Sequence, residues 1–116
     1  MLTGINNTGY EPSRHYMDFH IAGFTYWEGL EVIGDLKTGT ELTLKGEPVN
    51  PYDSEAVAVY LGNNKIGYVP KTMNSDISKF LHFGHSDLFE VKVSQIDMDE
   101  HPERQVRVVV RIKDIR

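Results

Sequence analysis

Aromatic side chains offer the most specific chemistry in this sequence. Tyr26 and Trp27 are adjacent, so only one of them could point into a core from a strand, and Tyr52 lies in a predicted turn. Exposed rings on a small β-domain form a platform on which unpaired bases stack, at about 1–3 kcal/mol per base. The full aromatic set is Tyr26, Trp27, Tyr52, Tyr60, Tyr68 and Phe83. The alternative is that these rings only cover the open ends of a barrel.

Two clusters of histidine and acidic residues raise the question of a metal site. The first holds His82, His85 and Asp87, and the second holds Asp97, Asp99, Glu100 and His101. A metal needs three or four ligands that converge on one point, whereas a predicted helix end at Gly84 separates the two histidines of the first cluster. We expect a solvated helix exit and a solvated turn, with no metal and no cofactor.

Motifs for covalent or phosphoryl-transfer chemistry do not occur. None of the serines has a Gly-x-Ser-x-Gly context, and neither a Walker motif nor a Gly-x-Gly-x-x-Gly motif is found. The sequence has no cysteine, which excludes a thiol nucleophile, a disulfide and a cysteine zinc site. We therefore expect a binding protein and not an enzyme.

Composition and charge limit the partners. The 116 residues are 40% hydrophobic and 25% charged, as in an ordinary globular domain. A net charge of −5 gives no global attraction for polyanions, so a nucleic-acid site would have to be local. No apolar run approaches the roughly 18 residues that span a membrane, and the N-terminus lacks a secretory signal. We expect a cytoplasmic protein that makes no membrane contact.

Short alternating segments separated by turn residues predict six β-strands. The expected strands are 17–24, 40–47, 56–61, 65–69, 88–96 and 104–112. Residues 1–16 are polar and unpatterned, so we expect them to form a flexible arm before a single domain over 17–116.

One clear helix is expected over 74–81, and a shorter one is plausible over 30–36. Asn74 is a favoured residue at a helix start, and Gly84 supplies a stop. An apolar stripe at helical spacing consists of Met73, Ile77, Phe80 and Leu81. Together the elements predict a mainly β fold, a small six-stranded antiparallel barrel of the OB or SH3 type with one or two short helices.

The segments around the aromatic residues resemble the HIRAN domain family. The matching segments are IAGFTYWEG at 21–29, LTLKGEP at 42–48, NPYD at 50–53, AVAV at 56–59 and KIGYVP at 65–70. The resemblance covers about residues 17 to 97. It implies an OB-related barrel, as found in Swi/Snf-type fork-remodelling translocases and in bacterial stand-alone or fused domains.

The resemblance also implies binding of single-stranded DNA with capture of its free 3′ end. By this resemblance Tyr26, Trp27 and Tyr52 would stack on bases, and Asn50 and Asp53 would hydrogen-bond the terminal sugar and base. Lys71 would neutralise a phosphate. A carboxylate accepts from a 3′-hydroxyl and repels a 3′-phosphate, so Asp53 would give end specificity. The expected DNA-binding residues are Tyr26, Trp27, Asn50, Tyr52, Asp53, Tyr68 and Lys71.

The sequence departs from the family pattern at three positions. Thr25 stands where some members have an arginine, and Gly46 stands where an arginine usually precedes Glu-Pro. The loss of two cations should weaken phosphate binding. Trp27 replaces a common tyrosine, which keeps the stacking surface and removes a hydroxyl.

Two other interpretations remain open. The valine-rich final strand, with Arg107 and Arg111 pointing outward, could be a sheet edge that pairs with another chain in a protein-interaction module. The domain could also act beside a helicase or nuclease partner, for instance in DNA repair.

Overall fold

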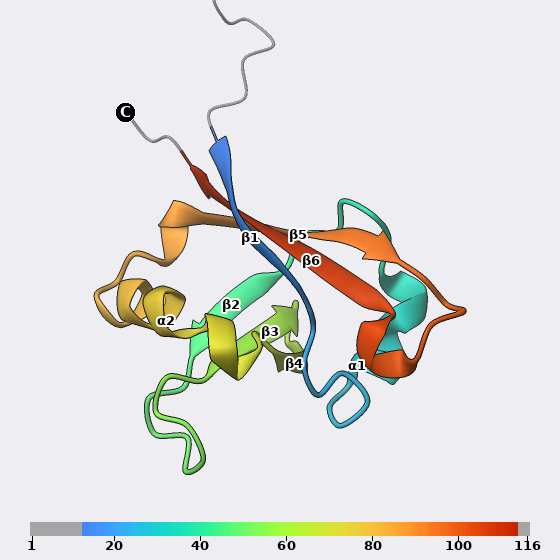
Figure 1. The fold of residues 1–116 in the computed structure, drawn as a ribbon, viewed down its shortest axis with the longest axis horizontal. Helices are drawn as coiled ribbons and strands as arrows, with labels where there is room; N and C mark the ends of the chain where they lie inside the picture. The colour runs from blue at the N-terminus through green and yellow to red at the C-terminus, as the bar shows by residue number, and fades with distance from the viewer. Residues whose placement is uncertain (1–12, 114–116) are drawn as a thin grey trace, which may run out of the picture.

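Six antiparallel strands form the body of the protein. The computed structural model describes residues 13–113. The strands are β1 (Ser13–His20), β2 (Thr43–Gly46), β3 (Val57–Leu61), β4 (Asn64–Tyr68), β5 (Phe89–Ile96) and β6 (Val106–Lys113). They form two three-stranded sheets with the orders β1-β6-β5 and β2-β3-β4, which cross one another in Figure 1. The predicted mainly β, six-stranded antiparallel fold is confirmed.

The two sheets meet at two corners. At one corner the N–H of Ala22 donates to the carbonyl of Tyr68 at 2.9 Å, and the N–H of Tyr68 donates back at 2.8 Å. At the other corner Glu41 bridges to Lys92, just before the chain enters β2. These are isolated bridges and not continuous strand pairing, so the sheets are not closed and the predicted term barrel describes them only loosely.

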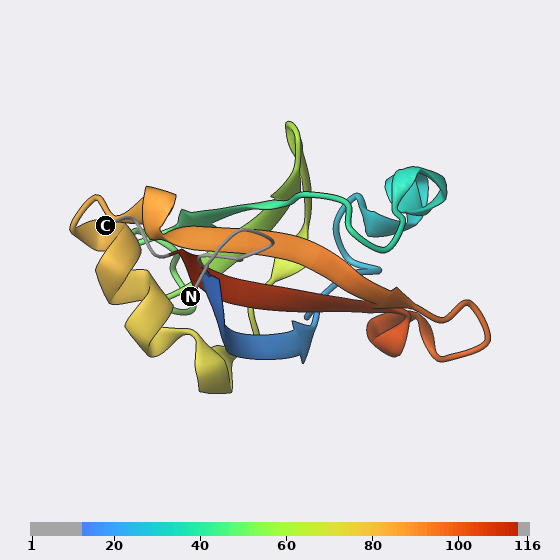
Figure 2. The same ribbon diagram turned by 90° about the horizontal axis from the view of Figure 1, so that it is seen from above.

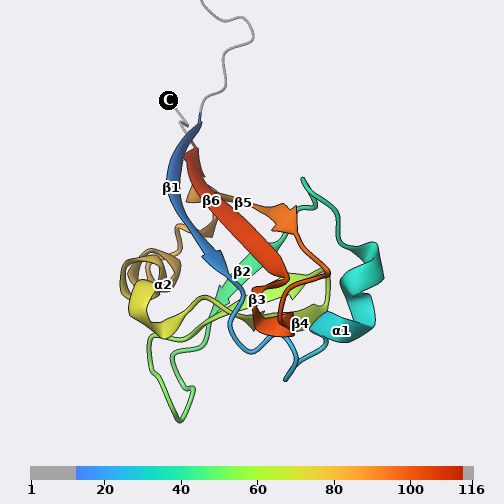
Figure 3. The ribbon, with the colours of Figure 1, turned by 45° about the vertical axis from the view of Figure 1, so that its right-hand side comes forward.

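The strand order of the sheet that contains β1 contradicts one interpretation of the sequence. β6 lies between β1 and β5 and pairs with both, as Figures 1 and 3 show. The prediction that the final strand forms an exposed edge is therefore wrong, because both sides of its backbone are already hydrogen-bonded. β1 begins at Ser13, four residues before the predicted start, and residues 1–12 of the expected arm lie outside the described residues.

Two short α-helices lie at opposite ends of the molecule (Figure 2). α1 (Gly29–Val32) continues into a 3-10 turn, η1 (Ile33–Asp35), and α2 (Ser75–His82) follows the 3-10 turn η2 (Lys71–Met73). Two further 3-10 turns are η3 (Ser86–Leu88) and η4 (Pro102–Arg104). The predicted helix over 74–81 is thus confirmed within one residue, whereas Arg104 belongs to a turn and not to the final strand. Among the described helices, none has the length and apolarity to cross a membrane.

Alternating strand residues fill a single core between the sheets. In β6 the side chains of Val106, Val108 and Val110 are buried, as the period-2 pattern predicted. α2 contributes Ile77, which is fully buried, and this contact fixes the helix against the core. The core therefore supports both the strands and the helix from which the loops described below emerge.

Gly67 permits the close approach at the Ala22–Tyr68 corner. Its φ of +148° lies in a region that side chains rarely adopt. A Cβ at this position would lie 2.4 Å from Cγ2 of Ile21 and 2.5 Å from the carbonyl oxygen of Ala22. Only glycine fits here, and its absent side chain lets the segment after β1 pair with β4.

Candidate functional site

Two loops from different sheets enclose a groove of about 360 Å³. One loop, residues 22–27, follows β1, and the other, residues 47–55, connects β2 to β3. Both project from the same side of the molecule in Figures 1 and 3. The groove is lined by all the residues that the sequence proposed for binding, namely Tyr26, Trp27, Asn50, Tyr52, Asp53, Tyr68 and Lys71.

The aromatic rings of the groove are available to a ligand. The side chains of Tyr26 and Tyr52 are 88% and 90% exposed, and Trp27 is 39% exposed. Rings that merely closed the end of a barrel would be packed against the core, so this alternative does not fit Tyr26 or Tyr52. Two members of the aromatic set lie elsewhere: Tyr60 packs under Lys45, and Phe83 lines another groove.

Gly23 lies near the start of the 22–27 loop, which we call the aromatic loop. Its φ of +70° turns the chain sharply, and its carbonyl accepts hydrogen bonds from the N–H groups of Tyr26 (2.9 Å) and Trp27 (3.3 Å). This tight turn explains why two adjacent aromatic residues can both leave the core. They are carried by a turn and not by a strand, in which one of them would point inward.

Glu103 holds the same loop from the far end of the sequence. Its carboxylate accepts hydrogen bonds from the N–H of Gly23 (2.9 Å), the N–H of Thr25 (3.1 Å) and the hydroxyl of Thr25 (3.0 Å). Partial burial opposes ionisation of Glu103, but these hydrogen bonds outweigh it and hold its pKa below the ordinary value. Thr25 therefore anchors the loop to the turn η4.

The opposite loop is built on Asn50. Its Oδ1 accepts hydrogen bonds from the N–H groups of Tyr52 (2.8 Å) and Asp53 (3.2 Å), and its Nδ2 donates to Glu47 at 3.0 Å. The amide thus folds the turn in which Pro51 lies. A hydrogen bond from this amide to a terminal sugar or base, as the resemblance implied, would compete with these contacts.

Asp53 presents a carboxylate to the groove. Its Oδ1 accepts from the N–H of Glu55 at 2.9 Å, and its Oδ2 accepts from Nδ2 of the buried Asn74, also at 2.9 Å. The hydrogen bond from Glu55 is the main cause that lowers the pKa of Asp53, followed by that from Asn74, with a smaller contribution from the charge of Lys71. Asp53 is consequently ionised at neutral pH.

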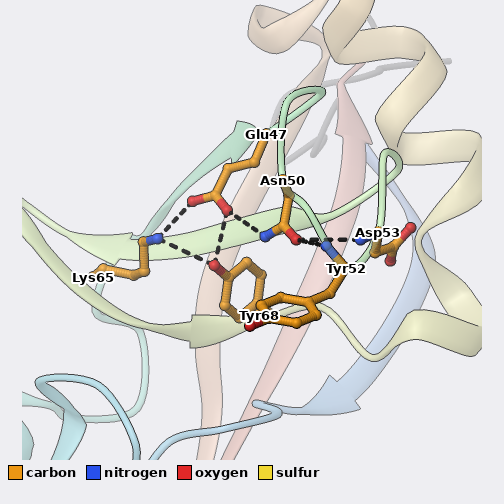
Figure 4. Close-up of polar contacts among 6 residues, drawn as sticks. All are labelled: Glu47, Asn50, Tyr52, Asp53, Lys65 and Tyr68. Atoms are coloured by element: carbon orange, nitrogen blue, oxygen red, sulfur yellow. Dashed lines mark hydrogen bonds and ion pairs between the residues drawn. The ribbon is translucent and has the colours of Figure 1, made fainter.

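A polar network links the 47–55 loop to β4 beside the groove (Figure 4). Glu47 accepts from Nζ of Lys65 at 2.6 Å and from the hydroxyl of Tyr68 at 2.8 Å, in addition to Asn50. Nζ of Lys65 also donates to the hydroxyl of Tyr68 at 3.1 Å. Burial raises the pKa of Glu47, but the hydrogen bond from Lys65, with those from Asn50 and Tyr68, lowers it by more. Glu47 and Lys65 therefore form an ion pair, and both carboxylate oxygens of Glu47 accept hydrogen bonds.

Trp27 rests on this network. Nζ of Lys65 lies 4.1 Å from the centre of the Trp27 ring, within the range of a cation–π interaction. The ring of Tyr68 contacts Trp27 edge-on, with ring centres 5.8 Å apart and planes at 69°. These contacts fix one face of Trp27 and leave part of the side chain open to the groove.

Three residues that shape the site were not among the predicted site residues: Glu47, Lys65 and Glu103. Glu47 stands in the loop motif, and its partial burial beside a lysine could not be inferred from spacing alone. Lys65 and Glu103 lie 38 and 78 residues from Trp27 and Thr25 respectively. Local patterns carry no signal for such contacts.

Elsewhere, the described residues offer little chemistry. Between residues 13 and 113, no three histidine or acidic side chains are arranged to hold a metal ion. A second groove of about 660 Å³ lies between α2 and the loop that follows β2, lined in part by Lys79, His82 and Phe83. Phe83 of the aromatic set lines it, but none of the seven expected DNA-binding residues does.

The groove is chemically suited to a flat ligand with one polar end. Exposed rings offer stacking surfaces, Asp53 offers an ionised acceptor, and Lys71 offers a cation. No nucleophile with an adjacent base lines it within the described part of the chain. The rings and the two charged groups suit recognition of such a ligand.

Comparisons with known proteins give a family and a fold. The family model of the HIRAN domain matches residues 15–113. A crystal structure of a protein from Lactobacillus plantarum superposes with a TM-score of 0.73 at 18% identity, covering 88% of this chain and 96% of that one. The crystal structure of the HIRAN domain of human HLTF superposes with a TM-score of 0.57 at 19% identity, covering 89% and 82%. No curated protein matches the sequence.

Proposed function

This chain belongs to the HIRAN domain family, a family of nucleic-acid-binding modules, and from that membership we propose that it captures the free 3′ end of single-stranded DNA. The terminal bases stack in the groove between the 22–27 and 47–55 loops. The protein acts as a binding module without catalytic activity of its own. It supplies end recognition to a helicase or nuclease, in the setting of DNA repair.

The observation that carries the proposal is the convergence of Tyr26, Trp27 and Tyr52 on one open groove. Single-stranded nucleic acids expose both faces of their bases, and aromatic rings replace the neighbouring bases on which they would otherwise stack. Exposed aromatic rings that gather at one place on a small domain mark an interaction site. A strand end provides such a ligand.

Asp53 supports selection of a hydroxyl end. Each of its oxygens accepts one hydrogen bond within the protein, and a carboxylate oxygen has room for a second. A 3′-hydroxyl can donate to it, whereas a 3′-phosphate would bring negative charge next to an ionised carboxylate. The lowered pKa of Asp53 keeps this discrimination in force at neutral pH.

Few phosphate contacts are expected. Lys71 is the one cationic side chain that lines the groove within residues 13–113, and it is exposed. The net charge of −5 adds no attraction from the rest of the molecule. Stacking must therefore supply most of the affinity, and the dependence on salt should be shallow, with a slope of about −0.7 for each phosphate contacted.

A titration of matched oligonucleotides tests the proposal. Trp27 is the only tryptophan, so its fluorescence reports directly on the groove. Short single strands ending in a 3′-hydroxyl should quench this fluorescence saturably and bind more tightly than the same strands ending in a 3′-phosphate. Equal affinity for both ends would refute end capture, and no binding to either would refute the nucleic-acid function. Duplexes with blunt ends serve as the control ligand.

A further inference from the structure

We propose that Lys65 is a positioning residue, which holds Trp27 and the 47–55 loop in the geometry that receives a base, and that it is not a phosphate ligand. This inference rests on the proposed function, and it assigns a different role to each of the two lysines beside the groove. Lys71 meets the strand, whereas Lys65 shapes the surface on which the strand lies.

The contacts of Lys65 engage its ammonium group with two hydrogen-bond acceptors and one aromatic ring of the protein itself. An ammonium group has three N–H donors. Nζ donates to Oε2 of Glu47 at 2.6 Å and to the hydroxyl of Tyr68 at 3.1 Å, and it lies 4.1 Å from the centre of the Trp27 ring. The side chain is half-buried, with the indole ring of Trp27 on one side and the phenol ring of Tyr68 5.1 Å away.

A continuous set of contacts runs from Trp27 to the opposite wall of the groove. Lys65 contacts Glu47, whose other oxygen accepts from Nδ2 of Asn50 at 3.0 Å. The Oδ1 of Asn50 then holds the N–H of Tyr52 at 2.8 Å. Figure 4 shows the part of this chain that runs from Lys65 through Glu47 and Asn50 to Tyr52. The two stacking walls come from different sheets, and this network ties them together.

Such a network lowers the cost of binding, because the free protein already holds its rings in place. A ring that is free to change rotamer must be immobilised when the ligand arrives. Loss of Lys65 should therefore weaken binding without changing how many phosphates are contacted. Loss of a phosphate ligand has the opposite signature, since the affinity falls together with the salt dependence.

Three variants separate these roles. Lys65→Met keeps the aliphatic length and removes the charge, Lys65→Arg keeps a cation that can contact both Glu47 and an aromatic ring, and Lys71→Met is the matched control. The measurements are the Trp27 emission of the free protein and a fluorescence titration with a 3′-hydroxyl oligonucleotide at several salt concentrations.

We expect Lys65→Met to change the emission of the free protein and to weaken binding roughly three- to tenfold with the wild-type salt slope. Lys65→Arg should restore most of the affinity. Lys71→Met should leave the free emission unchanged and flatten the salt slope by about 0.7. If Lys65→Met does not fold, Lys65→Gln, whose amide can still donate to Glu47, carries the same test.

Two results would overturn the inference. One is a folded Lys65→Met protein whose free emission and affinity both equal those of the wild type. The other is a loss of salt dependence in Lys65→Met as large as that in Lys71→Met, which would make Lys65 a phosphate contact. If the wild-type protein binds no oligonucleotide, the proposed function fails. The emission of the free variants then decides separately whether Lys65 positions Trp27.

Discussion

The carboxylate of Glu103 accepts a hydrogen bond from the backbone N–H of Gly23 at 2.9 Å, although 80 positions separate the two residues in the sequence. The same carboxylate also binds the backbone and the hydroxyl of Thr25. The aromatic loop is thereby held on its outer side by Glu103, while Lys65 supports Trp27 from beneath. The stacking wall is fixed from two directions before any ligand is present.

Replacement of Glu103 should loosen the aromatic loop. We expect Glu103→Gln to lower the free energy of unfolding by about 1–3 kcal/mol, because hydrogen bonds to a charged acceptor are lost. DNA affinity should fall in parallel. Thr25→Val, which removes only the hydroxyl, should have a smaller effect. Urea unfolding and fluorescence titration measure both quantities. Glu100→Gln, at an exposed acid just before the turn η4, is the control, and an equal loss there would show that Glu103 has no special role.

Removal of the stacking rings should abolish or strongly weaken binding. We expect Trp27→Ala and Tyr52→Ala each to cost about 1–3 kcal/mol of binding free energy, as stacked bases lose a partner. Tyr52 is 90% exposed, so Tyr52→Ala should leave stability nearly unchanged. Anisotropy of a labelled oligonucleotide gives the affinity without relying on tryptophan. Phe83→Ala removes an exposed ring outside the groove and should bind as the wild type does.

End discrimination should depend on the charge of Asp53. Asp53→Asn keeps the shape of the side chain and removes the repulsion of a terminal phosphate. We expect the ratio of affinities for 3′-hydroxyl and 3′-phosphate strands to fall toward one, through weaker binding of the first and stronger binding of the second. Competition between the two strands measures this ratio directly. A ratio that stays at the wild-type value would assign end selection to another group.

Stability should fall in acid. The pKa values of Glu47, Asp53 and Glu103 are lowered in the folded protein. The unfolded chain therefore binds more protons near its ordinary carboxyl pKa of about 4. The stability of the folded protein consequently rises with pH in that range. It is lost as the pH falls from about 5 through the lower pKa values of the folded state. Urea midpoints between pH 7 and pH 3 measure the change.

Glu47→Gln provides the matched comparison for the acid profile. It removes one of the carboxyls with a lowered pKa, so its stability should be lower at neutral pH and should decline less steeply in acid. A wild-type midpoint that does not change with pH would contradict the assignment, as would identical slopes for the two proteins.

Gly67 should tolerate no side chain. In Gly67→Ala the new Cβ would meet the carbonyl of Ala22 and the side chain of Ile21, and the backbone would also be strained. We expect a loss of at least about 2 kcal/mol of stability, or failure to fold. Gly39→Ala is the control, because its φ of +93° is also unfavourable but the space around it is open. In thermal denaturation, the melting temperature of Gly67→Ala should lie well below that of Gly39→Ala.

Much of the fold follows from local patterns. The alternating valines of β6 place a buried face correctly, because a strand repeats every two residues. The apolar stripe predicted for the helix is correct at Ile77, which is fully buried, whereas Phe80 of the same stripe is exposed. Pro51 likewise marks the loop that connects β2 to β3, whereas the strand predicted over 17–24 includes Gly23, which in the structure lies in the loop after β1. These signals predict most ends of the helices and strands to within one or two residues.

What the sequence could not give is how distant segments meet. The position of β6 between β1 and β5 depends on long-range pairing, which an alternating pattern does not encode, and the expectation of an exposed edge failed for that reason. The contacts that hold the aromatic residues of the site also join segments that are distant in the sequence. Lys65 reaches Trp27 and Glu103 reaches Gly23 only once the two sheets are assembled.

The central place of β6 also decides when the domain can mature during its synthesis. β1 leaves the ribosome first among the described strands, yet its only sheet partner is the last of them. Until β6 emerges, β1 stays unpaired, and Glu103 comes only just before β6 in the chain. A premature stop before residue 103 would therefore release a product that has all three stacking rings but lacks both Glu103 and the sheet partner of β1.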